Sequence, residues 1–382
     1  MSDVVISGLG LLTPFGRGVD TYWRRLVAGH SALAPARRFA AGPYRGEPIG
    51  EIAEAPESGP GAGSRQQAYA SAAVEDALRA ARLPRIPDDA LVILVGQSPL
   101  PADGSSLDPH GPLGPLDAEE REFLGPGATG ILAHGRAVHL THACASALFA
   151  VAFAREALRA GAAPLAVVAG ATALNHYEYA SMDVVRALDR AAARPFDTGR
   201  EGISLGEGGG ALVLEPAGRA RARGLDPDVV VAGTGCRVAA GKPVASDGGS
   251  VADCLREALD DARADRLDYV QAHATGTPQG DTAELRAVEA VAEEHAWEGL
   301  PVSSHKGAIG HLLHISGAAG VAAAAMALRT GVAPPTAGLR TPEETRRVRL
   351  PMTPLEIPGA SVAAVNSFGF GGNNATVILR RG

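Results

Sequence analysis

The chain has 382 residues, of which 46% are hydrophobic and 20% charged, and its formal net charge is −7. This composition predicts a globular protein of one large or two ordinary domains, and the negative charge argues against a nucleic-acid-binding protein. The three cysteines, Cys144, Cys236 and Cys254, are too few and too scattered for a disulfide framework or a zinc site.

The first residues and the apolar stretches predict a cytoplasmic protein without a membrane segment. Residues 1–6 lack the basic start of a signal peptide. The longest uncharged apolar stretch, residues 160–175, contains Pro164 and several glycines and is too short to span a bilayer. Arginine supplies nearly all of the basic residues, so the two lysines, Lys242 and Lys306, stand out.

Apolar periodicity predicts alternating strands and helices along the first half of the chain. Residues 34–65 form a loop rich in proline and glycine, and residues 97–130 form a long excursion with one charged helical turn near residues 117–123. Excursions of that length are usually functional or interfacial. Strands are expected at residues 3–10, 90–96 and 165–170, and helices at residues 19–28, at residues 67–83 and directly after Cys144.

The second half of the chain repeats the pattern of the first. Four similar segments recur in the same order: residues 228–235 resemble 3–10, residues 254–271 resemble 67–96, residues 327–334 resemble 157–164, and residues 372–379 resemble 208–214. A duplication of this kind predicts a layered α/β fold with pseudo-twofold symmetry. We expect an N-terminal half over residues 1–220 and a C-terminal half over residues 221–382.

Cys144 lies where an apolar segment, residues 137–140, meets a helix of small residues. At the start of a helix, unpaired backbone N–H groups and the helix dipole favour a thiolate, which is a nucleophile. A lone cysteine among alanines is nevertheless more often an inert core residue. Other parts of the chain must therefore support a functional interpretation.

Two histidine motifs and a glycine turn follow in the second half. His273 ends a predicted strand within residues 271–281, which is where sites gather in α/β proteins. Lys306, His311 and His314 precede an alanine-rich helix. The last motif, residues 366–376, is a glycine turn before the final strand. Each histidine alone could be a hydrogen-bonded structural imidazole, and the glycine turn alone is only a tight turn.

Taken together, these motifs resemble the β-ketoacyl-acyl-carrier-protein synthases, condensing enzymes of the thiolase superfamily. The resemblance covers nearly the whole chain. Its motifs occur in the family's order: residues 4–16, residues 143–146, residues 195–215, residues 273–281, residues 306–311 and residues 366–376. The resemblance implies a thiolase-like, five-layered αβαβα fold with two duplicated halves.

The resemblance also implies a decarboxylative Claisen condensation in fatty acid or polyketide biosynthesis. Cys144 would accept an acyl group from a phosphopantetheine thioester. His273 and His311 would donate hydrogen bonds to the enolate that forms as malonyl-thioester loses CO₂. The backbone N–H groups of Cys144 and Phe370 would hold the oxyanion of the acyl-cysteine.

Further residues have supporting roles in the family pattern. Lys306 would set the charge and geometry around the histidines, and Glu284 would order the region of Lys306. Thr275 and Thr277 would contact the pantetheine arm, and Phe370 would act as a gate beside the cysteine. No metal or bound cofactor is implied, because the substrates are carried on the phosphopantetheine of an acyl carrier protein. The implied assembly is a homodimer or a heterodimer with a ketosynthase-like subunit.

The chain departs from the family pattern at three places. His142 replaces a small hydroxyl residue two positions before Cys144, which could alter the acyl pocket. Three extra residues follow His311, so either His311 or His314 could take the catalytic position; the five-residue spacing from Lys306 favours His311. The segment between residues 96 and 144 looks shorter than in housekeeping members of the family. This leaves open the length of the acyl chain that the protein accepts and the identity of its partner subunit.

Three other functions compete with a condensing enzyme. A biosynthetic thiolase would need a second cysteine near the final glycine turn, and Phe370 has no cysteine beside it. A partner subunit like the chain-length factors usually lacks the nucleophile that Cys144 supplies here. A non-decarboxylating acyltransferase would load Cys144 without releasing CO₂.

Overall fold

The structure is a computed structural model that describes residues 3–37, 47–53, 65–96, 130–174, 176–239 and 247–382. The strands of the first half form a mixed sheet in the order β6-β5-β7-β8-β1. Only β8 runs antiparallel to the other four. Their bounds are β1 Val4–Thr13, β5 Leu91–Val95, β6 Ala137–Leu140, β7 Ala166–Thr172 and β8 Gly208–Pro216.

The strands of the second half follow the order β11-β10-β15-β16-β9, with β13 (Val348–Arg349) added beside β11. Here β16 is the antiparallel member, since it runs against both β15 and β9. Their bounds are β9 Val229–Val238, β10 Tyr269–Gln271, β11 Leu300–Ser303, β15 Val362–Gly369 and β16 Asn373–Arg381.

The two strand orders correspond position by position, which is the internal repeat that the sequence predicts. The halves meet where β1 and β9 pair at Val5 and Val230 and then separate. The predicted boundary between residues 220 and 221 falls inside the short helix α6 (Ala217–Ala222) and stays a prediction.

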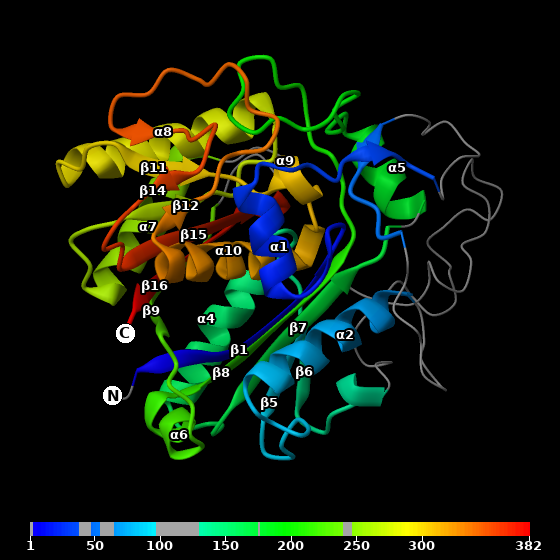
Figure 1. Cartoon of the computed structure of the whole chain (residues 1–382), viewed down its shortest axis with the longest axis vertical. Helices are drawn as coiled ribbons and strands as arrows, with labels where there is room; N and C mark the ends of the chain where they lie inside the picture. Colours follow the sequence, from blue (N-terminus) through cyan, green and yellow to red (C-terminus); the bar gives the residue numbers. More distant parts are fainter. Residues whose placement is uncertain (1–2, 38–46, 54–64, 97–129, 175, 240–246) are drawn as a thin grey trace.

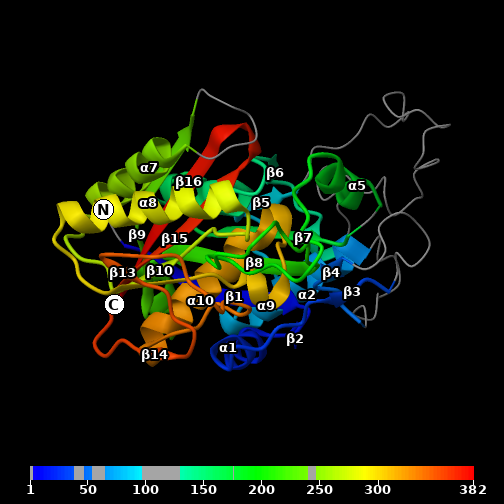
Figure 2. The same cartoon turned by 90° about the horizontal axis from the view of Figure 1, so that it is seen from above.

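Five layers result from the way the long helices pack. α4 (Ser146–Arg159) and α10 (Ser316–Thr330) lie between the two half-sheets, and each of them contacts strands of both. α2 (Arg65–Ala80) covers the outer face of the first half, and α7 (Gly248–Ala262) with α8 (Pro278–Glu294) covers the second. Figure 1 shows α4 and α10 near the centre, and Figure 2 shows α7 and α8 side by side.

The repeat is equally visible in how the first strand of each half meets its outer helix. In β1, a Cβ at Gly8 would collide with the carbonyl oxygen of Ala77 in α2, and a Cβ at Gly10 would collide with that of Ala73. A Cβ at Gly233 or Gly235 of β9 would collide with α7 in the same way. Glycine is required at these strand positions because a helix backbone lies directly against them.

Shorter elements connect this framework, and the predicted helix at residues 19–28 is among them as α1. Residues 97–129, which include the predicted helical turn, lie outside the described residues, as does most of the predicted loop at residues 34–65. The remaining bounds are β2 Gly16–Arg17, β3 Ala34–Pro35, β4 Pro48–Ile49, β12 Val332–Ala333, β14 Leu355–Glu356, α1 Val19–Val27, α5 His176–Val184, α9 Lys306–Ile309, η1 Gly130–Leu132, η2 Leu313–Ile315 and η3 Phe370–Gly372.

Candidate active site

Cys144 lies in the tight turn between β6 and α4. Ala143 before it has a φ of 48°, in the left-handed region that non-glycine residues seldom adopt. The buried Ser146 side chain holds this turn: its hydroxyl donates to the carbonyl oxygen of Ala143 at 2.6 Å and accepts from the N–H of His142 at 2.7 Å. The chain therefore fixes the backbone of Cys144 before the first helical residue.

The acidity of Cys144 differs from the sequence-based expectation of a favoured thiolate. The N–H groups of Ala145 and Ser146 are already bonded within the turn, to the carbonyl oxygens of His142 and Ala143. Burial raises the pKa of the Cys144 thiol to about 11, while the nearby Lys306 ammonium acts in the opposite direction. The thiol is therefore less acidic than the helix start alone predicts, because burial outweighs that effect.

His273 follows β10, and Glu284 of α8 holds its main chain. The carboxylate of Glu284 accepts from the N–H of His273 at 2.8 Å and from the N–H of Ala274 at 2.7 Å. It also accepts from Asn366 Nδ2 at 2.9 Å. Burial raises the pKa of Glu284, and these hydrogen bonds together with Lys306 act against that rise. The strand end is therefore locked to α8.

Lys306 is buried at the start of α9, and its ammonium donates to the carbonyl oxygen of His273. Burial lowers the pKa of Lys306 to about 8, against the attraction of Glu284, Cys144 and Asp281. The amine thus lies behind His273 and links its turn to α9.

His311 reaches the same place from the loop after α9. Its N–H donates to the carbonyl oxygen of Ser204 at 2.8 Å, and Gly310 before it needs a φ of 77°. The rings of His273 and His311 lie edge to face, with 5.5 Å between their centroids and 83° between their planes. The structure therefore brings both rings together.

Both imidazoles are neutral and have unused nitrogens. Burial, followed by the charge of Lys306, lowers the pKa of each ring well below its usual range. Nδ1 of His273 and both ring nitrogens of His311 are buried without a hydrogen-bond partner. Orphaned buried polar atoms are rare in folded proteins and often mark a functional site.

His314 takes a different position from His311. It lies in η2, and it is not among the residues that line the cavity beside Cys144. Burial and the neighbouring His139 lower its pKa to about 4. His311 is therefore the imidazole that faces His273, and the three residues that this chain has in addition to the family pattern lie after it.

A cavity of about 630 Å³ connects these groups with the surface. Thr275 and Thr277 line it with hydroxyls 3.3 Å apart, and Phe370 borders it with 38% of its surface exposed. The remaining lining is apolar or lies near the opening: Met182, Val185, Arg186, Ala187, Glu201, Ile203, Pro278, Gln279, Gly280, Phe368 and Gly369, with Cys144, His273 and His311.

Asp281 is a buried neighbour of the site, and the sequence motif that contains it assigned it no separate role. It is fully buried, and its oxygens accept from the N–H groups of Thr275, Gly276 and Phe196 at 2.9–3.1 Å. Burial raises its pKa to about 6. In the sequence, the feature that could have indicated a role for Asp281 is its position as an acidic residue inside a motif rich in glycine and threonine.

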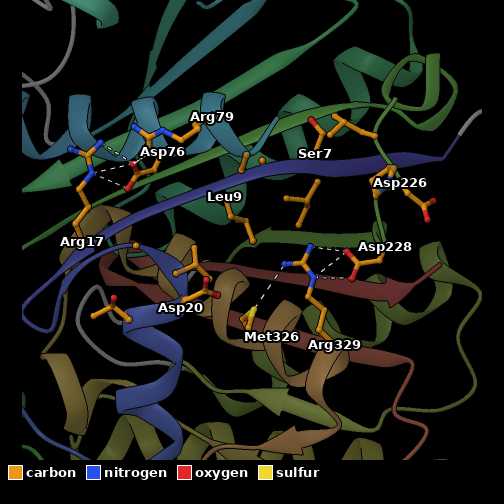
Figure 3. A pocket seen from close by; sticks show the side chains of 18 residues that line it. Ser7, Leu9, Arg17, Asp20, Asp76, Arg79, Asp226, Asp228, Met326 and Arg329 are labelled. Atoms are coloured by element: carbon orange, nitrogen blue, oxygen red, sulfur yellow. Dashed lines mark hydrogen bonds and ion pairs between the residues drawn. The ribbon is translucent and has the colours of Figure 1, made fainter. Parts of the chain in front are cut away.

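A second cavity, of about 610 Å³, contains none of the predicted site residues. Figure 3 shows ion pairs in it, among them those between Arg17 and Asp76 and between Arg329 and Asp228. Their shortest N–O distances are 2.8 and 2.6 Å, so these guanidinium groups are already paired.

Two kinds of feature are absent from the described part of the chain. No cluster of three or more His, Cys, Asp or Glu side chains there could hold a metal ion. Within the same residues, every helix is too short or too polar to cross a bilayer.

Comparison with known proteins gives consistent matches along the chain. The family model "Beta-ketoacyl synthase, N-terminal domain" matches residues 128–220, and "Beta-ketoacyl synthase, C-terminal domain" matches residues 229–340. The granaticin polyketide beta-ketoacyl synthase 1 of Streptomyces violaceoruber is 34% identical, over 99% of this chain and 98% of its own length. The 3-oxoacyl-[acyl-carrier-protein] synthase 2 of Coxiella burnetii is 30% identical, over 99% and 98%.

Among solved structures, the ishigamide ketosynthase/chain length factor superposes with a TM-score of 0.86. It is 28% identical in sequence, and the match covers 99% of both chains. The similarity thus includes the whole layered architecture as well as the motifs.

Proposed function

This chain belongs to the β-ketoacyl synthase family, whose members are acyltransferases with the thiolase fold, and we propose that it condenses an acyl thioester with malonyl-carrier protein. The observation that carries this proposal is the pair of neutral imidazoles, His273 and His311, beside Cys144 on one cavity. The polyketide and fatty acid relatives support the same reaction class.

The first step transfers the acyl group to Cys144. The sulfur attacks the thioester carbonyl carbon, the bond to the pantetheine sulfur breaks, and the proton of the Cys144 thiol ends on the departing sulfur. The backbone N–H groups of Cys144 and Phe370 hold the oxyanion. Support comes from the contact between the two segments, since the Ser367 hydroxyl donates to the carbonyl oxygen of Cys144 at 2.8 Å.

The second step is the decarboxylation of malonyl-thioester. The bond between its carboxylate carbon and Cα breaks, CO₂ leaves, and the electron pair moves to the thioester oxygen as an enolate. His273 and His311 donate hydrogen bonds from Nε2 to this oxygen; in His311 this nitrogen is buried without a partner, and burial favours the neutral form of both rings. Lys306 supports both rings through its charge and its bond to the His273 carbonyl.

The third step forms the new carbon–carbon bond. Cα of the enolate attacks the acyl carbonyl carbon on Cys144, and the sulfur leaves as a thiolate that takes up a proton. The charge of Lys306 acts against the rise in the pKa of Cys144 that burial causes, and it thereby supports the departure of the sulfur as a thiolate.

The cavity suits a phosphopantetheine arm on an acyl carrier protein. Thr275 and Thr277 would contact the arm, Phe370 would gate its end beside Cys144, and Arg186 near the opening would face its phosphate. No bound cofactor is needed for the proposed steps. A cytoplasmic location stays a prediction.

The assembly we propose is a homodimer or a heterodimer with a ketosynthase-like subunit. The solved ketosynthase/chain length factor is a relative with two such components. Among the described residues β6 is the last strand of the sheet, and Val138 on it and Phe153 on the neighbouring α4 are 39% and 47% exposed. An unpaired strand edge with exposed apolar neighbours suits a partner chain.

The deciding experiment combines intact-protein mass spectrometry with measurement of CO₂. The protein is mixed with a panel of acyl carrier proteins and then with malonyl-carrier, in the presence of any partner subunit. An acyl adduct followed by CO₂ release and a β-ketoacyl product supports the proposal. An adduct without CO₂ supports the non-decarboxylating acyltransferase instead, and the absence of any adduct supports a chain-length-factor-like subunit.

A further inference from the structure

His305 is a buried imidazole that the proposed reaction does not use. It precedes Lys306 directly, and only 2% of its surface is exposed. Both of its ring nitrogens have partners: Nδ1 lies 3.1 Å from Gln271 Nε2, and Nε2 lies 3.2 Å from Ser316 Oγ. It differs in this from His273 and His311, whose rings have nitrogens without partners.

The surrounding hydrogen bonds determine which nitrogen of His305 carries the proton. The Tyr269 hydroxyl donates to Gln271 Oε1 at 2.8 Å, so the amide group directs its NH₂ toward His305. An NH₂ group only donates, so Nδ1 of His305 must accept. Nε2 therefore carries the proton and donates to Ser316 Oγ.

The two partners of His305 come from segments that carry the proposed catalytic groups. Gln271 is the last residue of β10, two positions before His273. Ser316 is the first residue of α10, five positions after His311. His305 itself is bonded through the chain to Lys306, so one ring connects all three segments.

The ring is also confined by packing. Tyr22 of α1 meets it edge-on, with 6.5 Å between the ring centroids. At Gly320 of α10, an added Cβ would lie 3.8 Å from His305 Cε1 and 2.9 Å from Val365 Cγ1. The imidazole thus lies between α1 and α10 while it bridges Gln271 and Ser316.

The charged and titratable neighbours keep His305 neutral. Burial lowers its pKa well below the usual range, and the adjacent Lys306 ammonium lowers it further. A neutral ring fits the bridge, since an imidazolium would present a second proton to the donating amide of Gln271.

We propose that His305 is a positioning residue, whose bridge between Gln271 and Ser316 holds His273, Lys306 and His311 in register for decarboxylation. This inference rests on the proposed function. It predicts that loss of the bridge harms the enolate step far more than acylation of Cys144, because only the former depends on the relative placement of the two imidazoles.

The test compares four variants in the assembled enzyme. His305→Phe keeps a planar ring and removes both hydrogen bonds, Ser316→Ala removes one partner, and a double variant combines them. Tyr22→Phe is the matched control: it loses the bond from its hydroxyl to the carbonyl oxygen of Ala319 and keeps the ring against His305. Cys144 acylation, CO₂ release from malonyl-carrier, kcat, KM and thermal melting are measured for each.

His305→Phe should slow CO₂ release about 10- to 100-fold through kcat, with KM and acylation nearly unchanged. Ser316→Ala should slow it about three- to tenfold, and the double variant should be no slower than His305→Phe. Tyr22→Phe should match the parent. If His305→Phe does not fold, Ser316→Ala carries the test, since it deletes a single hydroxyl.

The inference would be overturned if each variant lost acylation and CO₂ release to the same extent, in proportion to the decrease in its melting temperature. Such a result would indicate a structural role alone. CO₂ release at the parental rate in Ser316→Ala and in a folded His305→Phe would overturn it as well. A parent enzyme that acylates Cys144 and releases no CO₂ would overturn the proposed function itself, and the role of His305 with it.

Discussion

The Lys306 ammonium donates its hydrogen bond to the carbonyl oxygen of His273 and not to either imidazole ring. The lysine thus restrains the main chain that carries one ring, and its charge disfavours protonation of both rings. Each neutral ring still carries one N–H that can donate to an enolate, and the positive charge beside the rings favours the negative charge that develops there.

Replacement of Cys144 by alanine should abolish acyl-enzyme formation and leave the fold intact. The proposed nucleophile is lost, and the turn around it is held by Ser146. Intact-protein mass spectrometry with an acyl-carrier panel measures the adduct, and peptide mapping locates it. Alanine variants at Cys236 and Cys254 serve as controls and should still be acylated; an adduct on either of these residues in the parent would contradict the assignment.

Replacement of His273 or His311 by alanine should slow CO₂ release by roughly two to three orders of magnitude. A donor aimed at a forming oxyanion is worth about 3–4 kcal/mol. Acylation of Cys144 should decrease less, because it does not pass through the enolate. His314→Ala is the control and should be mild; strong loss there, with near-normal His311→Ala, would show that the second motif is wrongly aligned.

The rate of decarboxylation should fall as the pH rises through about 8. Lys306 loses its charge there, since burial lowers its pKa to about 8. Stability responds with the opposite sign: between about pH 8 and the ordinary lysine pKa, the unfolded chain binds more protons, so the free energy of unfolding rises with pH. Rate profiles and urea denaturation of the parent and of Lys306→Met measure both effects. Identical profiles in the two proteins would exclude this role.

Glu284→Gln should destabilise the protein by about 2–3 kcal/mol and slow decarboxylation. The carboxylate accepts from three donors through its two oxygens, and the amide would replace one oxygen with an NH₂ group, so at least one buried donor would lack its partner. Urea denaturation measures the free energy of unfolding. Glu293→Gln, at an exposed position of the same helix, is the matched control and should change little.

The protein should form a dimer at micromolar concentration, alone or with its partner subunit. Val138→Asp should weaken the dimer, because it places a charge on the exposed edge strand β6. Val238→Asp places the same charge at another exposed valine and should have no effect. Sedimentation velocity distinguishes the states, and a dominant monomer of the parent with all partners present would refute this expectation.

The sequence by itself determined the repeated elements and the motifs, because both depend on local chemistry. Apolar periodicity identified strands such as β1 and β5, whose burial follows from side-chain alternation or continuous apolar runs. The recurrence of similar segments in the same order indicated that the second half repeats the first. The order of the motifs around Cys144, His273 and Lys306 identified the family.

Only the tertiary structure decided the properties that depend on surroundings supplied by distant segments. His311 and His314 have similar local sequences, and it is the contact of the His311 backbone with Ser204 that brings His311 to the ring of His273. The acidity of Cys144 follows from burial by both halves of the fold, which outweighs the helix start that local sequence suggests. The bridge made by His305 likewise exists only because β10 and α10 meet at one imidazole.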